Sequence, residues 1–197
     1  TDLDSQVTKL KLLKANHEGQ RYQLEDQLIQ FFPKAISRTQ EQITGLEQDL
    51  AVVQAHPLPD KEHFSITVAG QTYTERKAAG QAIIDACTKM TDVAERVPLG
   101  EYRGFPMTLW ADTSTQKFQV TMKHSLSHTI ELGSDPVGNI ARLENALAAI
   151  ADHLEQNRGK LENLNAQMEE AKLEVKRPFP QEQELAEKTS RLNVLRI

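Results

Sequence analysis

The chain has little of several residue types, and each shortage excludes a class of protein. Only one of its 197 residues is a cysteine, Cys87, so no disulfide forms within the chain and a reducing compartment is expected. The net charge is −5, which does not fit a protein that is basic throughout, as many nucleic-acid binders are. No run approaches the roughly 18 apolar residues of a membrane span, and no signal-peptide pattern opens the chain. We expect a cytoplasmic protein with no membrane partner.

Catalytic motifs are also missing. The sequence has no Gly-x-x-x-x-Gly-Lys-Ser/Thr phosphate loop, no Asp-Glu-x-His box and no Asn-Pro-Pro-Tyr methylase motif. His124 and His128 stand four residues apart with Glu131 close behind, but the pattern there is strand and loop, and no Cys or Asp completes a zinc ligand set. Cys87 lies among small apolar residues and is interpreted as a buried apolar side chain. We expect no enzyme activity, no cofactor, no metal and no small-molecule substrate.

The clearest pattern that is present is an apolar stripe in residues 136–177. It has the alternating spacing of three and four residues that is typical of a coiled coil, and only Asn157 interrupts it. Its members are Ile140, Leu143, Leu147, Ile150, Leu154, Leu161, Leu164, Met168, Ala171 and Val175. A helix of about 40 residues would be about 60 Å long.

Residues 1–58 have a similar but less regular pattern. The first stripe is Leu10, Leu13, His17, Leu24, Leu28, Phe31 and Ala35, and the second, in a shifted register, is Ile36, Ile43, Leu46, Leu50 and Val53. The shift falls at the Phe-Phe-Pro sequence that ends at Pro33, and a proline inside a helix removes one backbone hydrogen bond. We expect either one long helix bent near residue 33 or two helices joined there.

Residues 61–135 change period and predict a small α+β domain. Short runs that alternate apolar and polar residues, separated by Gly-containing turns, indicate an antiparallel sheet. A helical pattern near 75–90 lies between the first hairpin and the later strands. Residues 181–197 form a last helical pattern that ends abruptly, so we expect a truncated C-terminal helix that folds back on the base of the long helices.

The predicted fold class is therefore α+β and mostly helical. Two long helices of similar length flank the small domain, and each has an apolar stripe too long to leave in water. We expect them to pair as an antiparallel coiled-coil arm with the antiparallel-sheet-plus-helix domain at its tip. Because the chain opens on Thr1 and not on Met, we also expect it to be a piece of a longer polypeptide.

Several segments carry a resemblance to a known family. They are a Phe-containing hairpin followed by residues 73–80, then residues 100–105, 131–133, 138–147 and 178–185, with Lys188, Arg191 and Leu192. In this linked order the chain resembles a segment of very large proteins of bacterial conjugative elements and phages, which join an adenine-specific DNA methyltransferase to a Swi/Snf-type helicase. The resembling segment lies downstream of the helicase motor. The resemblance implies a DNA-processing context and not an activity for this segment.

Two functions follow as hypotheses. One is a non-catalytic accessory domain that positions or recognises DNA, or contacts other domains of the parent polypeptide, through the small domain. The candidate nucleic-acid contacts are Arg76, Lys77, Tyr102, Arg103, Lys117 and Lys123, with Trp110 as a second aromatic. For Tyr102 the alternative is a bend between strands that places the ring in the core. The other hypothesis is a structural module that mediates protein–protein contacts or self-association through the coiled coil.

Overall fold

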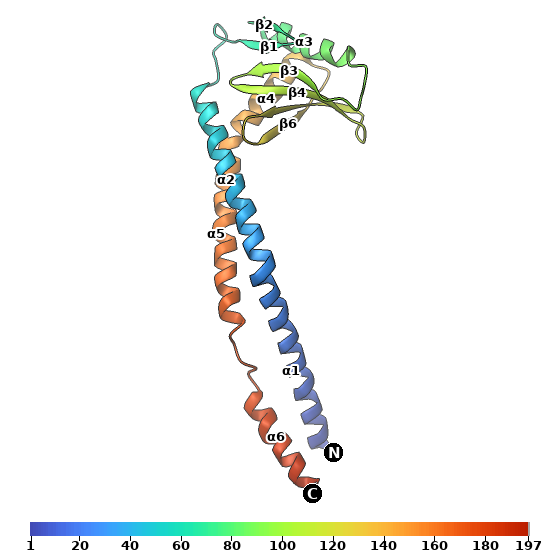
Figure 1. Ribbon diagram of the computed structural model, residues 1–197, viewed down its shortest axis with the longest axis vertical. Coiled ribbons are helices and arrows are strands. Elements are labelled where there is room, and N and C mark those ends of the chain that lie inside the picture. Colours follow the sequence, from blue (N-terminus) through green and yellow to red (C-terminus); the bar gives the residue numbers. More distant parts are fainter. Residues whose placement is uncertain (197) are drawn as a thin grey trace. The chain divides into compact units, whose positions relative to one another are not determined.

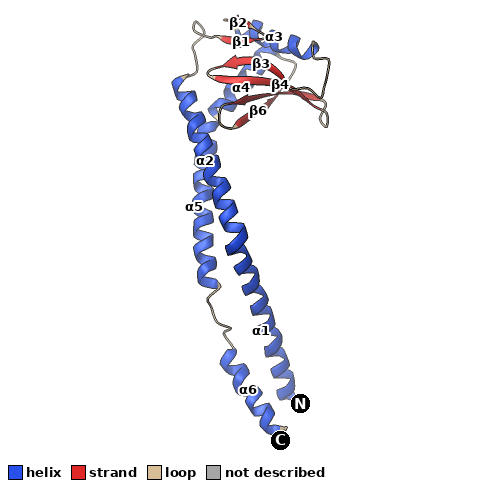
Figure 2. Ribbon diagram, viewed as in Figure 1, coloured by secondary structure: helices blue, strands red, loops and turns tan. Residues whose placement is uncertain are grey.

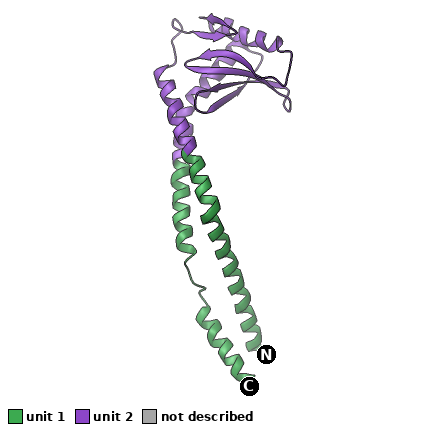
Figure 3. Cartoon of the chain, in the orientation of Figure 1, with its two compact units in different colours: residues 1–40, 159–197 green, residues 41–158 purple. Residues whose placement is uncertain are grey.

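The structure, a computed structural model, describes residues 1–196. The chain divides into two units (Figure 3): one consists of residues 1–40 and the chain from residue 159 onwards, and the other of residues 41–158. The second unit is called the sheet unit below and the first the helical unit. Helices and a six-stranded antiparallel sheet together make the fold α+β and mostly helical, as predicted.

The sheet unit is built on six strands, in the order β2-β1-β3-β4-β5-β6 with every neighbouring pair antiparallel (Figures 1 and 2). Their bounds are β1 Ile66–Val68, β2 Gln71–Tyr73, β3 Val97–Tyr102, β4 Phe105–Asp112, β5 Lys117–Lys123 and β6 Ser127–Glu131. The first two and the last two strands lie close to the predicted ones, but β3 begins earlier than predicted and the turn to β4 falls inside the run of residues 100–105 that was expected to be one strand. Helix α3 (Arg76–Thr88) follows β2, and helix α4 (Pro136–Ala148) follows β6.

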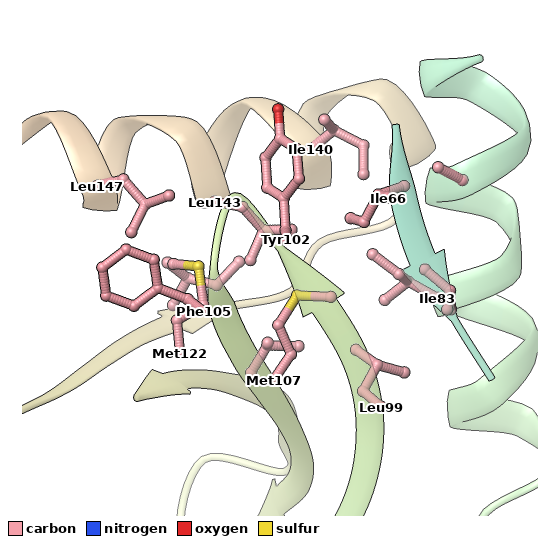
Figure 4. Packing of buried hydrophobic residues seen from close by; sticks show 14 of the residues in the cluster. Ile66, Ile83, Leu99, Tyr102, Phe105, Met107, Met122, Ile140, Leu143 and Leu147 are labelled. Carbon is pink, nitrogen blue, oxygen red and sulfur yellow. The ribbon is translucent and has the colours of Figure 1, made fainter. Parts of the chain in front are cut away.

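One face of the sheet is packed, and the other is open. Alternate residues of β4, for example Phe105, Met107 and Leu109, are buried, while Pro106 between them is exposed. Figure 4 shows Phe105 and Met107 packed together with side chains of α3 and α4, two helices that lie on the same side of the sheet. Residues 41–55 at the end of α2 (Phe32–Ala55) and the start of α5 (Ile150–Glu174) contribute to the same core through Leu46 and Leu154.

Two glycines permit close backbone approaches in this unit. A Cβ at Gly100, whose φ is +154°, would lie 1.8 Å from the carbonyl oxygen of Thr67 on the neighbouring strand. A Cβ at Gly80 in α3 would lie 2.0 Å from the carbonyl oxygen of Pro136 at the start of α4. A side chain at either position would push apart elements that are now in contact, so both glycines are needed for the sheet unit to close.

The helical unit contains α1 (Asp2–Asp26), the short π-helix η1 (Gln27–Phe31), the first part of α2, the later part of α5, and α6 (Glu182–Leu195). It has two separate apolar clusters. In the first, Val7 and Leu10 of α1 pack on Phe179, Leu185 and Leu192. The second, near Pro33, contains Leu24, Leu28, Phe32, Ala35, Ile36, Leu164, Met168 and Ala171.

Near Pro33, where a bend or a joint was expected, helices α1 and α2 follow one another without a break through the π turn η1. The backbone N–H of Phe32 bonds to the carbonyl oxygen of Gln27, five residues back, and α2 continues from there. Phe32 lies four residues after Leu28, a spacing that places both side chains on one face of a helix. Phe32 is buried and Phe31 is 53% exposed. The prediction that Phe31 belongs to the inward stripe was therefore wrong.

The C-terminal helix also differs from its prediction. It does not fold back: α6 lies along α1, antiparallel to it. An ion pair joins Lys14 to Glu182 at one end (2.9 Å), and another joins Asp4 to Arg196 at the other (2.7 Å). Pro178 and Pro180 precede α6, and the irregular segment between α5 and α6 lets the last helix continue along α1.

The two long helical stretches are interrupted only locally, but the units divide each of them. Ala149 separates α4 from α5 without a gap in hydrogen bonding, because its N–H reaches Asn145 and its carbonyl accepts from His153. The units divide the chain after residues 40 and 158, whereas the sequence-based division treated residues 1–58 and 136–177 as one segment each. Among residues 1–196, no helix combines the length and the apolar content needed to cross a membrane.

Candidate nucleic-acid interface

Two of the predicted contact residues belong to an internal network. The hydroxyl of Tyr102 donates to the carboxylate of Glu144 (3.1 Å), and the guanidinium of Arg76 pairs with the same carboxylate. Arg76 also lies over the ring of Phe64, 4.7 Å from its centroid. Tyr102 is only 1% exposed, and burial, reinforced by the negative charge of Glu144, raises the pKa of its hydroxyl. The alternative interpretation of Tyr102 as a core residue fits this position, and the interpretation as a stacking residue does not.

Arg103 lies in the two-residue turn between β3 and β4. Its φ is +49° and that of Gly104 is +82°, the left-handed pair that a tight hairpin requires. Its Nε atom donates to the carbonyl oxygen of His56, just beyond the end of α2 (2.8 Å). A cation that bonds to carbonyls at a helix C-terminus stabilises that end. Arg103 therefore has a structural partner within the sheet unit.

The three predicted lysines lie apart from one another. Lys77 is exposed in the first turn of α3 and lines a cavity of about 560 Å³ with Lys61 and Arg76. Lys117 and Lys123 are the first and last residues of β5, and Lys117 pairs with Glu131 (3.3 Å). The structure therefore does not bring the six predicted residues into one patch.

A different group of side chains comes together on the open face of the sheet. The guanidinium of Arg96, which precedes β3, lies over the indole ring of Trp110 on β4, 4.5 Å from its centroid. The indole N–H donates to the hydroxyl of Thr121 on β5 (2.9 Å), and Thr121 shares a hydrogen bond of 2.9 Å with Thr129 on β6. We call Arg96, Trp110, Thr121 and Thr129 the stacking platform.

Two outward-facing residues at the platform are more buried than an open face would suggest. Gln119 and Thr121 are only 9% and 8% exposed, although their side chains point to the face that α3 and α4 do not cover. Gln119 stands directly opposite Trp110 in the register of β4 and β5. The indole reaches across to β5, where its N–H bonds to Thr121. The aromatic ring is therefore held in place by the neighbouring strand, and the exposed Arg96 covers its outer side.

Charges of both signs flank the platform. Lys117 and Lys123 stand at the two ends of β5, and Glu131 and Asp112 stand on the neighbouring strands. Both carboxylates already accept from protein groups: Glu131 from Lys117, and Asp112 from the backbone N–H and the hydroxyl of Ser114. These Ser114 hydrogen bonds lower the pKa of Asp112. The face is neither strongly basic nor strongly acidic.

The remaining ionisable groups of interest have structural partners. Asp49 of α2 is fully buried and accepts from the backbone N–H groups of Ser125 and Leu126 (2.7 and 3.0 Å) and from Nε2 of His128 (2.6 Å). This network holds α2 against the β5–β6 hairpin. Cys87 is half-buried, and burial raises the pKa of its thiol to about 11. Within residues 1–196, no three His, Cys, Asp or Glu side chains are grouped as metal ligands.

Comparisons with protein-family models, with curated proteins and with solved structures find no match to this chain. The resemblance to a segment of helicase–methyltransferase proteins therefore remains a hypothesis from the sequence.

The sequence predicted Trp110 as a candidate contact but not Arg96, Thr121 or Thr129. Arg96 is one of several cations in the middle region and stands outside any strand pattern, so only the folded loop brings it over the indole. The threonines carry a weak signal, because Thr108, Thr121 and Thr129 all occupy outward positions of predicted strands. A polar row on one face of a sheet is also what a solvated face requires, so that signal by itself does not indicate a site.

Proposed function

We propose that this chain is a non-catalytic accessory part of a larger DNA-processing protein and that its sheet unit contacts nucleic acid through the open face. The observation that carries the proposal is the position of the Arg96 guanidinium over the ring of Trp110 on that face. Aromatic and guanidinium planes on sheet surfaces are recurrent features of proteins that bind nucleic acid by stacking. Lys117 and Lys123 add positive charge at both ends of β5.

The expected binding is weak. The chain has a net charge of −5, and one of the two flanking lysines is already paired with Glu131. Few phosphate contacts give affinities at or weaker than about 1 μM and a small dependence on salt. Such a module would position DNA for a neighbouring catalytic domain and would not capture it alone.

We further propose that the two long helical stretches pair as an antiparallel coiled-coil arm with the sheet domain at its tip. The three–four spacing of the stripe from Ile140 to Val175 supports this arrangement. Packing of α2 residues with α5 residues occurs in both units. Leu147→Asp combined with Leu154→Asp would place two charges at buried helical positions, and we expect loss of helicity by circular dichroism. Unchanged helicity and melting temperature would contradict the arm.

Fluorescence anisotropy of the purified chain with labelled DNA, at low and at physiological salt, tests the nucleic-acid proposal. We expect salt-sensitive binding that weakens severalfold in Arg96→Ala and in Lys123→Ala. Arg38→Ala is the matched control, because Arg38 is an exposed cation in the helical unit. Absence of binding to any DNA form at low salt, or equal weakening in the control, would overturn the proposal.

One observation favours a second candidate, a protein-interaction function of the helical unit. Tyr22 of α1 and Ile29 of η1 are 68% and 74% exposed, and their spacing of seven residues places them on nearly the same face of the helix. Large apolar side chains that share an exposed face can mark a contact surface. Sedimentation velocity at several concentrations tests self-association. A dimer that is lost in the double variant Tyr22→Ser with Ile29→Ser would support this candidate, and a monomer at all concentrations would count against self-association.

A further inference from the structure

We infer that the ligand of the open face is single-stranded nucleic acid, whose unpaired bases stack on the plane of Arg96 above Trp110. This inference rests on the proposed function and narrows it to one form of nucleic acid. It follows from the geometry of the stacking platform, from the positions of the two lysines and from the shape of the face.

The platform is preorganised for stacking. A hydrogen bond from the indole to Thr121, and a hydrogen bond shared between Thr121 and Thr129, tie Trp110 to two further strands, so the ring loses little freedom when a ligand binds. Arg96 lies over the outer side of the ring, 4.5 Å from the centroid, and is itself exposed. The surface offered to a ligand is therefore a guanidinium plane backed by an aromatic ring, on which any base can stack.

The lysines stand on either side of this platform. Lys117 and Lys123 are six residues apart on β5, and Gln119, which faces Trp110, lies between them. At about 3.3 Å per residue their Cα atoms are separated by roughly 20 Å. A backbone that follows β5 would thus meet a cation at each end, with room between for about the two or three bases that a small sheet stacks.

A duplex does not suit this surface. Its bases are already stacked and paired, so none is available to the platform. Its major groove, about 12 Å wide, admits a helix or a two-stranded ribbon, and here the face is a broad sheet of six strands. Duplex DNA would be limited to backbone contacts with Arg96, Lys117 and Lys123, which a single strand can make equally well. Single strands gain the stacking contribution in addition.

The experiment measures anisotropy of the full chain with labelled oligothymidylate, oligodeoxyadenylate and a duplex of equal length. We expect single strands to bind about tenfold more tightly than the duplex, since one stacked base contributes roughly that factor. Trp110 is the only tryptophan of the chain, so its fluorescence should be quenched by the single strands.

Two variants separate stacking from charge. Arg96→Lys keeps the positive charge but lacks the guanidinium plane, and it should reduce the preference for single strands to about twofold while duplex binding stays the same. Arg38→Ala should leave all affinities unchanged.

The possible results distinguish the single-strand inference from the proposed function on which it rests. Equal or tighter binding of the duplex would overturn the single-strand inference and leave the proposed function standing. If Arg96→Lys left the preference for single strands unchanged, the bases would bind elsewhere on the chain, and the claim that they stack on Arg96 would be wrong. No binding to any of the three oligonucleotides would overturn both.

Discussion

The sheet unit and the helical unit bury their apolar side chains in different ways. In the sheet unit one cluster of 19 buried residues joins strands and helices into a single core. In the helical unit the two clusters contain five and three buried residues and do not meet. Stability of a cooperative unit follows from contiguous burial. The sheet unit should therefore unfold as a whole, and the helical unit should open in parts and at lower denaturant.

The two units also differ in how deeply their polar and charged side chains are buried. The sheet unit buries Asp49, His128 and the Tyr102–Glu144 contact among apolar residues, whereas the ion pairs of the helical unit, such as that of Lys14 with Glu182, are largely exposed. Exposed pairs contribute little, while a buried partner is costly to remove. Trp110 lies in the sheet unit, so its fluorescence follows that unit alone, and far-ultraviolet circular dichroism follows both.

The largest loss of stability should come from Asp49→Ala. The substitution leaves the ring of His128 and two backbone N–H groups without their acceptor in a dry site. We expect the free energy of unfolding of the sheet unit to fall by about 3–5 kcal/mol. Urea unfolding monitored by Trp110 fluorescence measures it. Asp152→Ala, at an exposed position of α5, is the control and should stay within about 0.5 kcal/mol. A loss below about 1 kcal/mol for Asp49→Ala would show that the network is dispensable.

A matched pair of leucines compares the two units directly. Leu143 is fully buried in the large core, and Leu185 lies in the five-residue cluster of the helical unit. Leu143→Ala should lower the free energy of unfolding followed by Trp110 by about 3 kcal/mol, because the surrounding core cannot collapse into the cavity. Leu185→Ala should leave that transition unchanged and reduce helicity at low denaturant. If Leu185→Ala shifted the Trp110 transition as much as Leu143→Ala does, the two units would be one cooperative structure.

A third prediction concerns the π turn, which has no counterpart in the sheet unit. Deleting the exposed Gln30 in a Pro33→Ala background would convert η1 into an α turn and keep Leu28 and Phe32 on one face. We expect a cost of about 1 kcal/mol or less. Deleting Asn16 in the same background would rotate the segment before it by about 100° relative to the rest of the helix. We expect that deletion to abolish the packing of Val7 and Leu10.

Circular dichroism at 222 nm during urea titration distinguishes the two deletions. The helical unit should retain its low-denaturant transition in the first variant and lose it in the second. Equal behaviour would mean that the π turn does not set the register of the two stripes.

The helices and strands were largely predictable from the sequence, because the spacing of apolar residues that indicates them extends over only a few neighbouring residues. Alternation in residues 61–135 predicted an antiparallel sheet and located most of its strands, although it ran β3 into the turn that follows it. The three–four spacing identified the positions of Leu143, Leu147 and Leu154, which are all buried. The choice between Phe31 and Phe32 was not predictable, since they lie three and four residues after Leu28 and both spacings fall on one face of a helix. Two neighbouring phenylalanines beside a proline do not reveal which of them faces inward.

The candidate site was less predictable, because it depends on contacts between distant residues. Arg76 and Arg103 look free in the sequence, but each finds a partner far along the chain, Glu144 and the carbonyl of His56. Arg96 finds Trp110 in the same way. A cation in a sequence is a candidate contact, and only the fold decides whether its charge is already paired.

The smallest effect expected is a loss of stability at alkaline pH, confined to the sheet unit. Burial raises the pKa of the Cys87 thiol to about 11 and also raises the pKa of the Tyr102 hydroxyl. In the unfolded chain these groups ionise near about 8.5 and 10, so the unfolded state releases protons first as the pH rises. Stability is complete below the unfolded pKa values and falls as the pH rises through the folded ones. The thiol is only half-buried, so solvent screening keeps its share of the loss small.

Cys87→Ala tests the part of the alkaline loss of stability that comes from ionisation of the thiol. Urea unfolding followed by Trp110 at neutral pH and at about pH 10 should show a smaller decrease in the variant than in the parent, because the variant has no thiol to ionise in the unfolded state. Tyr102→Phe should remove the later part, but it also loses the hydrogen bond to Glu144 and therefore lowers stability at every pH. Neither Cys87 nor Tyr102 lies in the helical unit, so the low-denaturant change in helicity should not respond to either substitution. An alkaline decrease of equal size in the parent and in both variants would assign the pH dependence to other groups.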